Sequence, residues 1–442
     1  MASVMSSSFP LARTGNRCDR PRRGRDYSQP VSISLRPLTP DDFAAAWQLL
    51  QIAFGDKGDD EDVAAEQSVF EYDRSVGAFS DGDLVGCLSA WSFELSLPHG
   101  ALPAAGTTWV AVSPTHRRRG VLRALMDAHL GDVARRGEPL AALWASEAPI
   151  YGRFGYGSAA ERLRLTVDLP RLHWRDDVDV ADAQIRLVRL DDAETLLDPI
   201  YEAVRRRRPG MHRRGSKAWW HYKALSTREE AMDGASVKAV AVASVDGEPA
   251  AYAIYGLTEH WPSNTGTPAG TITVHELAGV DDAAEASLWR YLCSHDLVTT
   301  LKASLVPADV TLPWLVTDPR RVGRQLYDAL WLRIIDVPAA LTARGWHDSA
   351  QLTVQVIDDV FASNDDTWRL EVAPEGAVCE RAPDAEPDVT MTVESLGALY
   401  LGGTPLARLT SAGRVRVRDR RAADELDRAL WVRYLPWAPE VW

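Results

Sequence analysis

The chain has 442 residues, too many for one hydrophobic core, and we expect about two to four domains. Acidic residues outnumber basic ones by 62 to 49, and the net charge of -13 argues against a nucleic-acid-binding protein. This charge suits a cationic substrate, although solubility alone explains it equally well. The four cysteines are too scattered for a metal or redox motif and indicate a reduced, cytoplasmic protein. The sequence contains no run of about 18 apolar residues, so no membrane-spanning helix is predicted.

The first structured segment follows a tail. Residues 1–32 are rich in Ser, Arg and Pro and lack the apolar core of a secretory signal, which predicts a disordered tail. A strand is expected at 33–38. Thr39, Pro40 and the acidic residues after them form a helix start signal, and apolar residues at helical spacing extend that helix to Phe54.

Strands follow this helix. Residues 76–79 and 84–90 flank an Asp-Gly turn and predict a hairpin. A further strand at 91–97 is expected to lead through a Pro- and Gly-containing loop at 98–106 into a strand at 109–112. Together with the helix and strand that come next, the order β-α-β-β-β-β-α-β predicts an α+β layer whose chemistry follows the fourth strand.

The strand at 109–112 leads into the stretch that carries this chemistry. It enters a basic turn at 116–120 and a helix beginning near Val121, and a strand at 140–144 follows. Main-chain N–H groups at such a turn point at an anion, the helix dipole adds to them, and Gly120 lets the main chain approach closely. Arginines at a helix start belong to a solvated surface as often as to an anion site, but the position after an apolar strand favours an anion site here. We therefore predict a site for a polyanion such as a pyrophosphate.

The next segment repeats this layout. A strand at 184–190 is followed by an acidic helix cap, residues 237–244 and 248–255 form a hairpin around another Asp-Gly, and a strand at 271–280 precedes a helix. No basic glycine turn lies between that strand and that helix. We expect a degenerate copy of the first fold that has lost its phosphate turn. The arginine run 205–208 reads as a solvated helix end or a contact between subunits.

A third segment begins near Ile334. The elements expected there are a helix from 337, strands at 352–356, 368–372 and 389–393, and helices at 394–401 and 422–430. The chain ends on apolar residues from Trp437 to Trp442, where a polar and frayed end is usual, and we expect this end to be buried.

Motifs in the central stretch are similar to those of known enzymes. Arg117-x-x-Gly120-x-Leu122 resembles the acetyl-CoA pyrophosphate loop of GCN5-related N-acetyltransferases, with Leu122 in place of the usual small residue. A longer match closely resembles the enhanced intracellular survival (Eis) acetyltransferases of actinobacteria and covers nearly the whole chain after residue 32. The runs that carry it are 110–120, 145–147, 150–157, 323–325, 330–334 and 396–403.

This resemblance implies a fold and an assembly. The fold class is α+β, with tandem GCN5-related acetyltransferase folds, the second one degenerate, followed by a sterol-carrier-protein-like α+β domain. The implied bounds are 1–32 for the tail, 33–178 for the catalytic domain, 179–333 for the degenerate domain and 334–442 for the last domain. Members of this family assemble as hexamers, trimers of dimers, which implies a homohexamer here.

The resemblance also implies roles for individual residues. Tyr151 matches the general acid of the family, and the α-carboxylate of Trp442 matches its general base. From the residues alone, Tyr151 also fits a packed turn and Trp442 a core plug. The strand would hold the pantetheine arm of acetyl-CoA and the turn its pyrophosphate. The implied contacts are Val110, Ala111, Val112, Arg117, Arg118, Arg119, Gly120, Val121, Leu122, Arg123, Ser146 and Glu147.

Several other side chains near these motifs need an interpretation. Asp56 and Glu440 are candidates for an acidic wall around a cationic amine, with plain surface charge as the alternative. His129 and His275 read as surface or strand residues, and Tyr156 reads as structural.

The leading hypothesis is an acetyl-CoA-dependent N-acetyltransferase, without a metal, that acts on amines of bulky cationic molecules such as aminoglycosides. Transfer to an amine needs a neutral nitrogen and a proton for the departing thiolate, which a carboxylate and a tyrosine can supply. Lysine side chains of proteins are alternative acceptors. A second hypothesis is a lipid or acyl-CoA binding protein that works through its third domain and needs an open apolar cavity there. Neither hypothesis involves nucleic acid or a membrane.

Overall fold

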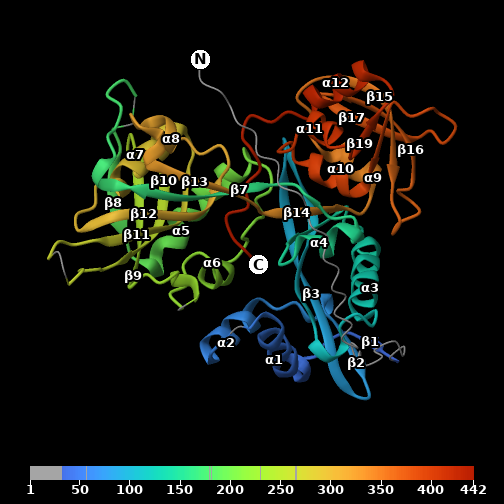
Figure 1. Ribbon diagram of the computed structural model, residues 1–442, viewed down its shortest axis with the longest axis horizontal. Coiled ribbons are helices and arrows are strands. Elements are labelled where there is room, and N and C mark those ends of the chain that lie inside the picture. Colours follow the sequence, from blue (N-terminus) through green and yellow to red (C-terminus); the bar gives the residue numbers. More distant parts are fainter. Residues whose placement is uncertain (1–31, 56, 179, 181, 229, 264–265) are drawn as a thin grey trace, which may run out of the picture.

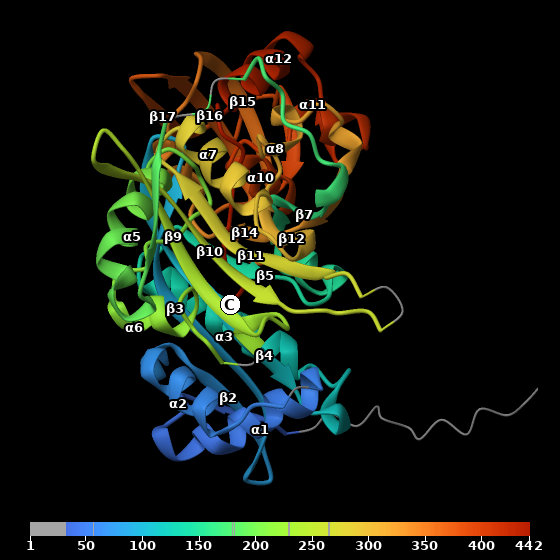
Figure 2. The ribbon, with the colours of Figure 1, turned by 90° about the vertical axis from the view of Figure 1, so that its left-hand side faces the viewer.

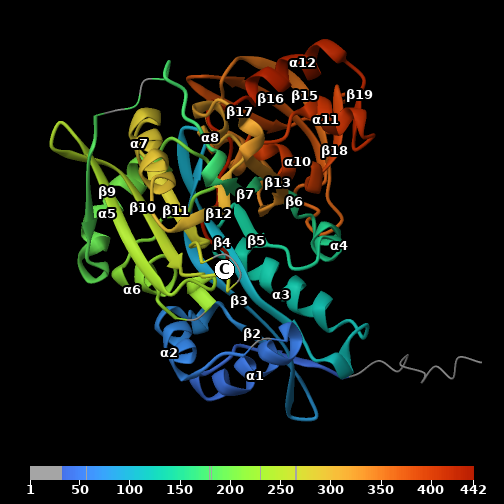
Figure 3. The same cartoon turned by 60° about the vertical axis from the view of Figure 1, so that its left-hand side comes forward.

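The computed structural model describes residues 32–442 apart from 56, 179, 181, 229 and 264–265. Within these residues three sheets form, of seven, seven and five strands. Figure 1 shows them as three lobes, coloured blue to cyan, green to yellow and orange to red, with the C-terminus between them. Figure 2 and Figure 3 show the same central place for the C-terminus from two other sides. No helix of the described part is long and apolar enough to cross a bilayer.

The first lobe is a seven-stranded sheet in the order β1-β2-β3-β4-β5-β14-β6. The helical segment starts where predicted, because Thr39 and Asp42 form a capping box on a short 3-10 turn, Pro40–Asp42, that leads into α1. Helix α1 stops at Gly55, whose φ of 73° is left-handed. Its elements are β1 (Ser34–Arg36), α1 (Phe43–Phe54), α2 (Asp60–Val69), β2 (Val76–Ser80), β3 (Asp83–Leu97), β4 (Gly100–Val112), α3 (Val121–Arg135), β5 (Leu140–Trp144), α4 (Ala148–Tyr151), β6 (Gly157–Ser158) and β14 (Leu330–Ile334).

The long hairpin of β3 and β4 corrects one prediction. The expected loop at 98–106 is wrong, because β4 already begins at Gly100 and pairs with β3 from Leu97 onward. Gly106 is a strand residue that lies under an aromatic ring: a Cβ atom there would come within 2.2 Å of the Phe93 ring. Its small size therefore serves packing rather than a turn, which composition alone did not distinguish.

The sheet opens between β4 and β5. These two strands pair in parallel only where Ala104–Gly106 meets Leu140–Ala142, and from Thr107 onward they separate. On the other side β4 stays paired with β3 up to Val112. The main chain of Val110–Val112 therefore presents one edge to the opening.

The second lobe repeats this layout, which confirms the predicted duplication. β11 and β12 pair in parallel up to Val274 and Ala303 and then separate, as β4 and β5 do. The sheet order is β13-β7-β12-β11-β10-β9-β8. Its elements are β7 (Glu161–Asp168), β8 (Gln184–Val188), α5 (Leu190–Arg205), α6 (Lys217–Tyr222), β9 (Val237–Val245), β10 (Glu248–Thr258), β11 (Gly270–Gly279), α7 (Asp282–Cys293), β12 (Val298–Pro307), α8 (Leu312–Leu315) and β13 (Val322–Asp328).

The first two lobes exchange strands. β7 follows the first lobe along the chain but lies between β12 and β13 of the second sheet. In return β14 follows the second lobe and lies between β5 and β6 of the first sheet. This exchange ties the two lobes together, and no sequence signal predicted it. The domain bounds at 178 and 333 stay predictions.

The third lobe packs directly on the first. Helix α10 lies against β14 and β6, since a Cβ atom on Gly157 would come within 1.9 Å of the Glu394 carbonyl oxygen. A single core joins Leu140 and Leu332 to Val354 and Leu399. The elements are α9 (Val337–Ala343), β15 (Ala350–Ile357), β16 (Asp366–Ala373), β17 (Gly376–Arg381), β18 (Val389–Thr392), α10 (Val393–Tyr400), α11 (Leu406–Ser411), β19 (Val415–Val417) and α12 (Arg420–Ala429). From here the chain returns to the centre of the molecule (Figure 1).

Candidate active site

A cleft of about 580 Å³ lies at the opening between β4 and β5. Gly120 caps the start of α3 with a φ of 85°, and no side chain caps that helix. The first amides of α3 are therefore free to bind an anion, and glycine suits the left-handed turn that presents them. The side chains of Arg117, Arg118 and Arg123 are exposed around this turn and add positive charge.

The structure brings most of the predicted cofactor residues together in this cleft. Arg119 is not among the residues that line it. The walls also include His116, Ile150, Arg153 and Phe154. Of the predicted residues, those on the walls are Val110, Ala111, Val112, Arg117, Arg118, Gly120, Val121, Leu122, Arg123, Ser146, Glu147 and Tyr151.

A second pocket of about 440 Å³ adjoins the first. The two share Phe54, Val110, Ser146 and Tyr151 as wall residues, so they meet at Tyr151. Aromatic side chains dominate the second pocket, and its walls come from the first lobe, the second lobe and the C-terminus. They include Trp47, Trp91, Trp109, Trp144, Tyr222 and Trp442.

Tyr151 ends the short helix α4 and is 5% exposed. Burial raises the pKa of its hydroxyl above the usual 10, a hydrogen bond with Ser146 opposes this, and the charge of Glu147 adds to it. The phenol therefore stays protonated at neutral pH. It lies where the two pockets meet and carries its proton.

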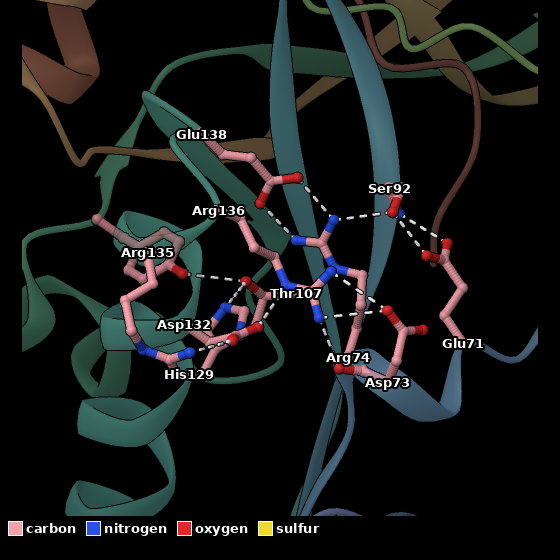
Figure 4. A network of polar contacts seen from close by, with 11 residues as sticks. Glu71, Asp73, Arg74, Ser92, Thr107, His129, Asp132, Arg135, Arg136 and Glu138 are labelled. Atoms are coloured by element: carbon pink, nitrogen blue, oxygen red, sulfur yellow. Dashed lines mark hydrogen bonds and ion pairs between the residues drawn. The ribbon is translucent and has the colours of Figure 1, made fainter.

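A buried polar chain lies beneath Tyr151. The Tyr151 ring packs edge-on against Tyr156, and the Tyr156 hydroxyl lies 3.0 Å from Thr107 Oγ1. Thr107 in turn bonds His129 Nε2 at 2.8 Å (Figure 4). The prediction of His129 as a surface or strand residue is wrong, because it lies buried on α3, where burial and then Arg74 lower its pKa to about 3. Thr107 occupies the point where β4 leaves β5, so this series of hydrogen-bonded side chains lies at the opening of the sheet.

An ion pair braces the same region. Arg74 donates to both carboxylate oxygens of Glu138, at 2.6 and 2.5 Å, and to the hydroxyl of Ser92 at 2.8 Å (Figure 4). Both charged side chains are buried or nearly so. A bidentate pair of this kind fixes the segment before β2 against the strand entrance at Glu138.

The chain terminus forms part of the second pocket. Trp437 and Ala438 are buried, as expected, whereas Val441 is 48% exposed. The Trp442 ring packs edge-on against Phe93 and Trp144, with centroids 5.0 and 6.3 Å apart. The structure thus brings Trp442 and Tyr151 to the walls of one pocket.

The two predicted acidic substrate residues lie elsewhere. Asp56 is outside the described residues. Glu440 is buried and accepts hydrogen bonds from Arg214 and Trp219, and it lies 2.6 Å from His212 Nε2. Burial by itself would raise the pKa of Glu440, but Arg214 and His212 outweigh burial and lower it. Its carboxylate lines a neighbouring cavity of about 400 Å³, not the aromatic pocket.

Sequence reasoning missed the carboxylate that does lie in the aromatic pocket. Glu66 on α2 accepts hydrogen bonds from the hydroxyl of Tyr222 and from Trp109 Nε1. Asp59 and Asp62 form a capping box at the start of α2, and this pair was a sequence signal that could have predicted the helix. The partner Tyr222 belongs to α6 of the second lobe, and no local pattern could indicate that contact.

The duplicated fold, the glycine turn and the cleft define a GCN5-related acetyltransferase. Family models described as "Acetyltransferase (GNAT) domain" match residues 34–159 and 210–334, and one described as "Sterol carrier protein domain" matches 337–439. Enzymes of this class use acetyl-CoA. The residues present fit this donor, because free helix amides, arginines and an unpaired strand edge meet in one cleft. Within the described ranges, no group of three or more His, Cys, Asp or Glu could hold a metal ion.

The chain belongs to the Eis family of N-acetyltransferases. It is 33% identical over 410 residues to N-acetyltransferase Eis of Mycobacterium tuberculosis, a match covering 90% of this chain and 97% of that protein. An uncharacterized N-acetyltransferase of Streptomyces avermitilis is 37% identical over 412 residues, covering 92% and 99%. The crystal structure of Eis1 from Mycobacterium abscessus superposes with a TM-score of 0.79 at 30% identity, covering 92% of this chain and 100% of that one.

Proposed function

We propose that this N-acetyltransferase acetylates primary amines of bulky cationic small molecules, with aminoglycosides as the expected substrate type. The observation that carries the proposal is the meeting of the two pockets at Tyr151, with Trp442 on the wall of the aromatic one. Assembly as a homohexamer and a cytoplasmic location belong to the same proposal, through the family resemblance.

The donor side follows from the cleft. Acetyl-CoA, when bound, supplies an acetyl thioester. The free amides of α3, with Arg117, Arg118 and Arg123, are suited to the pyrophosphate. The open edge of Val110–Val112 offers main-chain groups to the pantetheine arm, and the cleft leads from there to Tyr151.

Tyr151 is the proposed general acid. As the bond from the amine nitrogen to the acetyl carbon forms and the carbon–sulfur bond breaks, the leaving sulfur needs a proton. The Tyr151 hydroxyl holds one at the junction of the two pockets, because burial keeps the phenol neutral.

The α-carboxylate of Trp442 is the proposed general base. Amines are mostly protonated at neutral pH, so the acceptor must lose a proton before it attacks. A carboxylate on the wall of the acceptor pocket both attracts the ammonium group and accepts its proton. Packing of the indole on Phe93 and Trp144 holds the terminus in that wall.

The pocket walls support a cationic acceptor. Trp47, Trp91 and Trp109 line the pocket, and aromatic rings attract ammonium groups. The carboxylate of Glu66 adds negative charge, which opposes the positive charges of Arg162 and Lys223 on the same walls. A volume of about 440 Å³ accommodates a bulky molecule rather than a simple amine.

The test is a thiol-release assay of the full chain with aminoglycosides, simple amines and lysine peptides as acceptors. We expect the highest kcat/KM with aminoglycosides, and a preference for lysine peptides would replace the proposed substrate class. Tyr151→Phe should lower turnover by about 10²- to 10⁴-fold while acetyl-CoA binds as before. The matched control is Tyr291→Phe on α7 of the second lobe, which removes a hydroxyl that bonds Tyr255 and lines neither pocket, and it should leave turnover unchanged. Normal turnover by Tyr151→Phe would contradict the assignment of the acid.

A further inference from the structure

The chain itself fills the part of the opening in the second sheet that adjoins α7, and the cavity of about 400 Å³ lined by Val274, Leu305 and Glu440 remains beside it. β11 and β12 separate after Val274 and Ala303, at the position where the first sheet forms its cleft. Trp437 enters this opening: its indole N–H donates to the Leu305 carbonyl of β12 at 2.6 Å, and its ring packs with Ala278 of β11. The space left between Trp437, β11, β12 and α7 is about 20 Å³. That is room for about one water molecule.

The adjoining helix start is closed to a phosphate. Asp281 caps α7 by accepting a hydrogen bond from the Ala284 amide at 2.6 Å, whereas α3 of the first lobe has no side-chain cap. Asp282 and Glu285 add negative charge in the first turn of α7. A helix start that is already capped by carboxylates does not attract another anion.

Arg208, the last residue of the arginine run 205–208, holds the tail, whereas Arg206 and Arg207 are exposed as the predicted helix end implies. Arg208 donates to the main-chain carbonyl of Leu435 at 2.8 Å and to Asp309 at 2.6 Å. Asp309 accepts the Leu435 amide at 2.8 Å, and the Trp437 amide donates to the Pro209 carbonyl at 2.9 Å. The main chain of the tail is thus fixed from both sides.

A second anchor lies two residues before the end. The carboxylate of Glu440 meets Arg214, His212 and Trp219, all contributed by the segment from 212 to 219. Arg214 is fixed in turn by a bidentate pair with Glu276 of β11, at 3.0 and 2.5 Å, and by the rings of Tyr201 and Trp220, whose centroids both lie 4.1 Å from its guanidinium carbon. Beyond this anchor, Val441 is exposed and Trp442 enters the aromatic pocket.

We propose that the second lobe is a dock for the C-terminal segment, which it grips at Trp437 and Glu440 so that the terminus is held in the acceptor pocket. Glu440 is a positioning residue that acts through Trp442. The positioning of Trp442 as a base rests on the proposed function, whereas the docking of the C-terminal segment on the second lobe does not. A general base must be held close to its working position, since small displacements lower rates strongly.

The test measures how firmly the C-terminal segment is held, without relying on enzyme activity. Carboxypeptidase A is added to the full chain, and release of Trp442 is followed by mass spectrometry. We expect slow release from the wild type and at least tenfold faster release from Glu440→Gln and from Trp437→Phe, which lose a charge and an N–H donor respectively. Glu425→Gln removes the charge of a carboxylate in the third lobe, and Tyr255→Phe removes a buried hydroxyl in the second lobe away from the tail. Both controls should release Trp442 at the wild-type rate.

The outcomes separate the dock from the proposed chemistry. Wild-type release from both tail variants overturns the dock, as does equally fast release from Tyr255→Phe, because that would show a general loosening of the lobe. If Glu440→Gln does not fold, Trp437→Phe decides. Faster release together with a lower kcat and an unchanged KM for acetyl-CoA supports both proposals. Faster release with normal kcat supports the dock and overturns Trp442 as the base.

Discussion

A buried ion pair beneath the turn that carries Tyr151 gives a prediction about stability. Arg333 on β14 donates to both oxygens of Asp358 at 2.8 Å, and both side chains are fully buried. A Cβ atom on Gly155 would come within 2.9 Å of the Arg333 guanidinium, so this charge lies directly under the turn. The Asp358 carboxylate also accepts from the Val360 amide at 3.0 Å and the Asn364 side chain at 2.9 Å.

Asp358→Leu should therefore be strongly destabilising. It leaves the Arg333 charge buried without a partner, which costs about 3 to 5 kcal/mol, and it leaves further donors unsatisfied. Replacing both residues, as in Arg333→Met with Asp358→Leu, removes the charge as well and should recover most of that loss. Glu425→Gln, which breaks a surface pair with Arg421, should change stability by about 0.5 kcal/mol or less.

The assay is urea denaturation followed by circular dichroism, combined with hydrogen exchange of the β14 amides as a local readout. Local exchange is needed because a chain of several lobes need not unfold in a single step. A loss below about 1 kcal/mol for Asp358→Leu would refute the reasoning. So would a double variant that is as unstable as the sum of the two single ones, since the coupling between the charges would then be absent.

Three further predictions concern the chemistry and its support. Adding one glycine after Trp442 moves the carboxylate by about 3.5 Å and should lower kcat in the thiol-release assay by about 100-fold; normal rates would show that the terminus is not the base. Glu66→Gln should raise KM for a cationic acceptor by about 5- to 30-fold, measured against an uncharged amine whose KM stays constant. His129 has a pKa of about 3 in the fold, below its ordinary 6.5, so the unfolded chain binds its proton first as pH falls. The fold should therefore lose about 1.4 kcal/mol per pH unit between pH 6.5 and 3 through this group, and urea titrations of His129→Gln should lack that component.

The donor side of the site was predictable because its signals are local. The strand, the turn and the start of α3 are contiguous, so the spacing of Arg117 and Gly120 already determines how the amides are presented. The second copy was visible for the same reason, as a repeated order of strands and helices. Tyr151 lies only a few residues after β5, and its place at the cleft follows from that short connection.

The acceptor side was not predictable because it is built from distant segments. Glu66, Tyr222 and Trp442 meet only after two lobes and the tail have packed together. Glu440 illustrates the limit: an acidic residue near the proposed base suggests a substrate contact, but its partners Arg214 and His212 become visible only in the fold. The strand exchange of β7 and β14 could not be predicted from the sequence either, because each strand looks like an ordinary continuation of the segment that precedes it.

A degenerate second copy that still has an open sheet raises a physical question. Where β11 and β12 separate, their main-chain groups lose partners, and buried main-chain groups without partners are costly. In the first lobe the corresponding edge faces a cleft shaped for a ligand, but the acidic start of α7 makes the same ligand unfavourable in the second. Trp437 fills the part of the gap next to α7 and satisfies the Leu305 carbonyl. The same contact holds the end of the chain only five residues from its terminus. The tail thus occupies in the second lobe the place that the cofactor cleft takes in the first, and under the proposed function the same contact positions the terminal carboxylate.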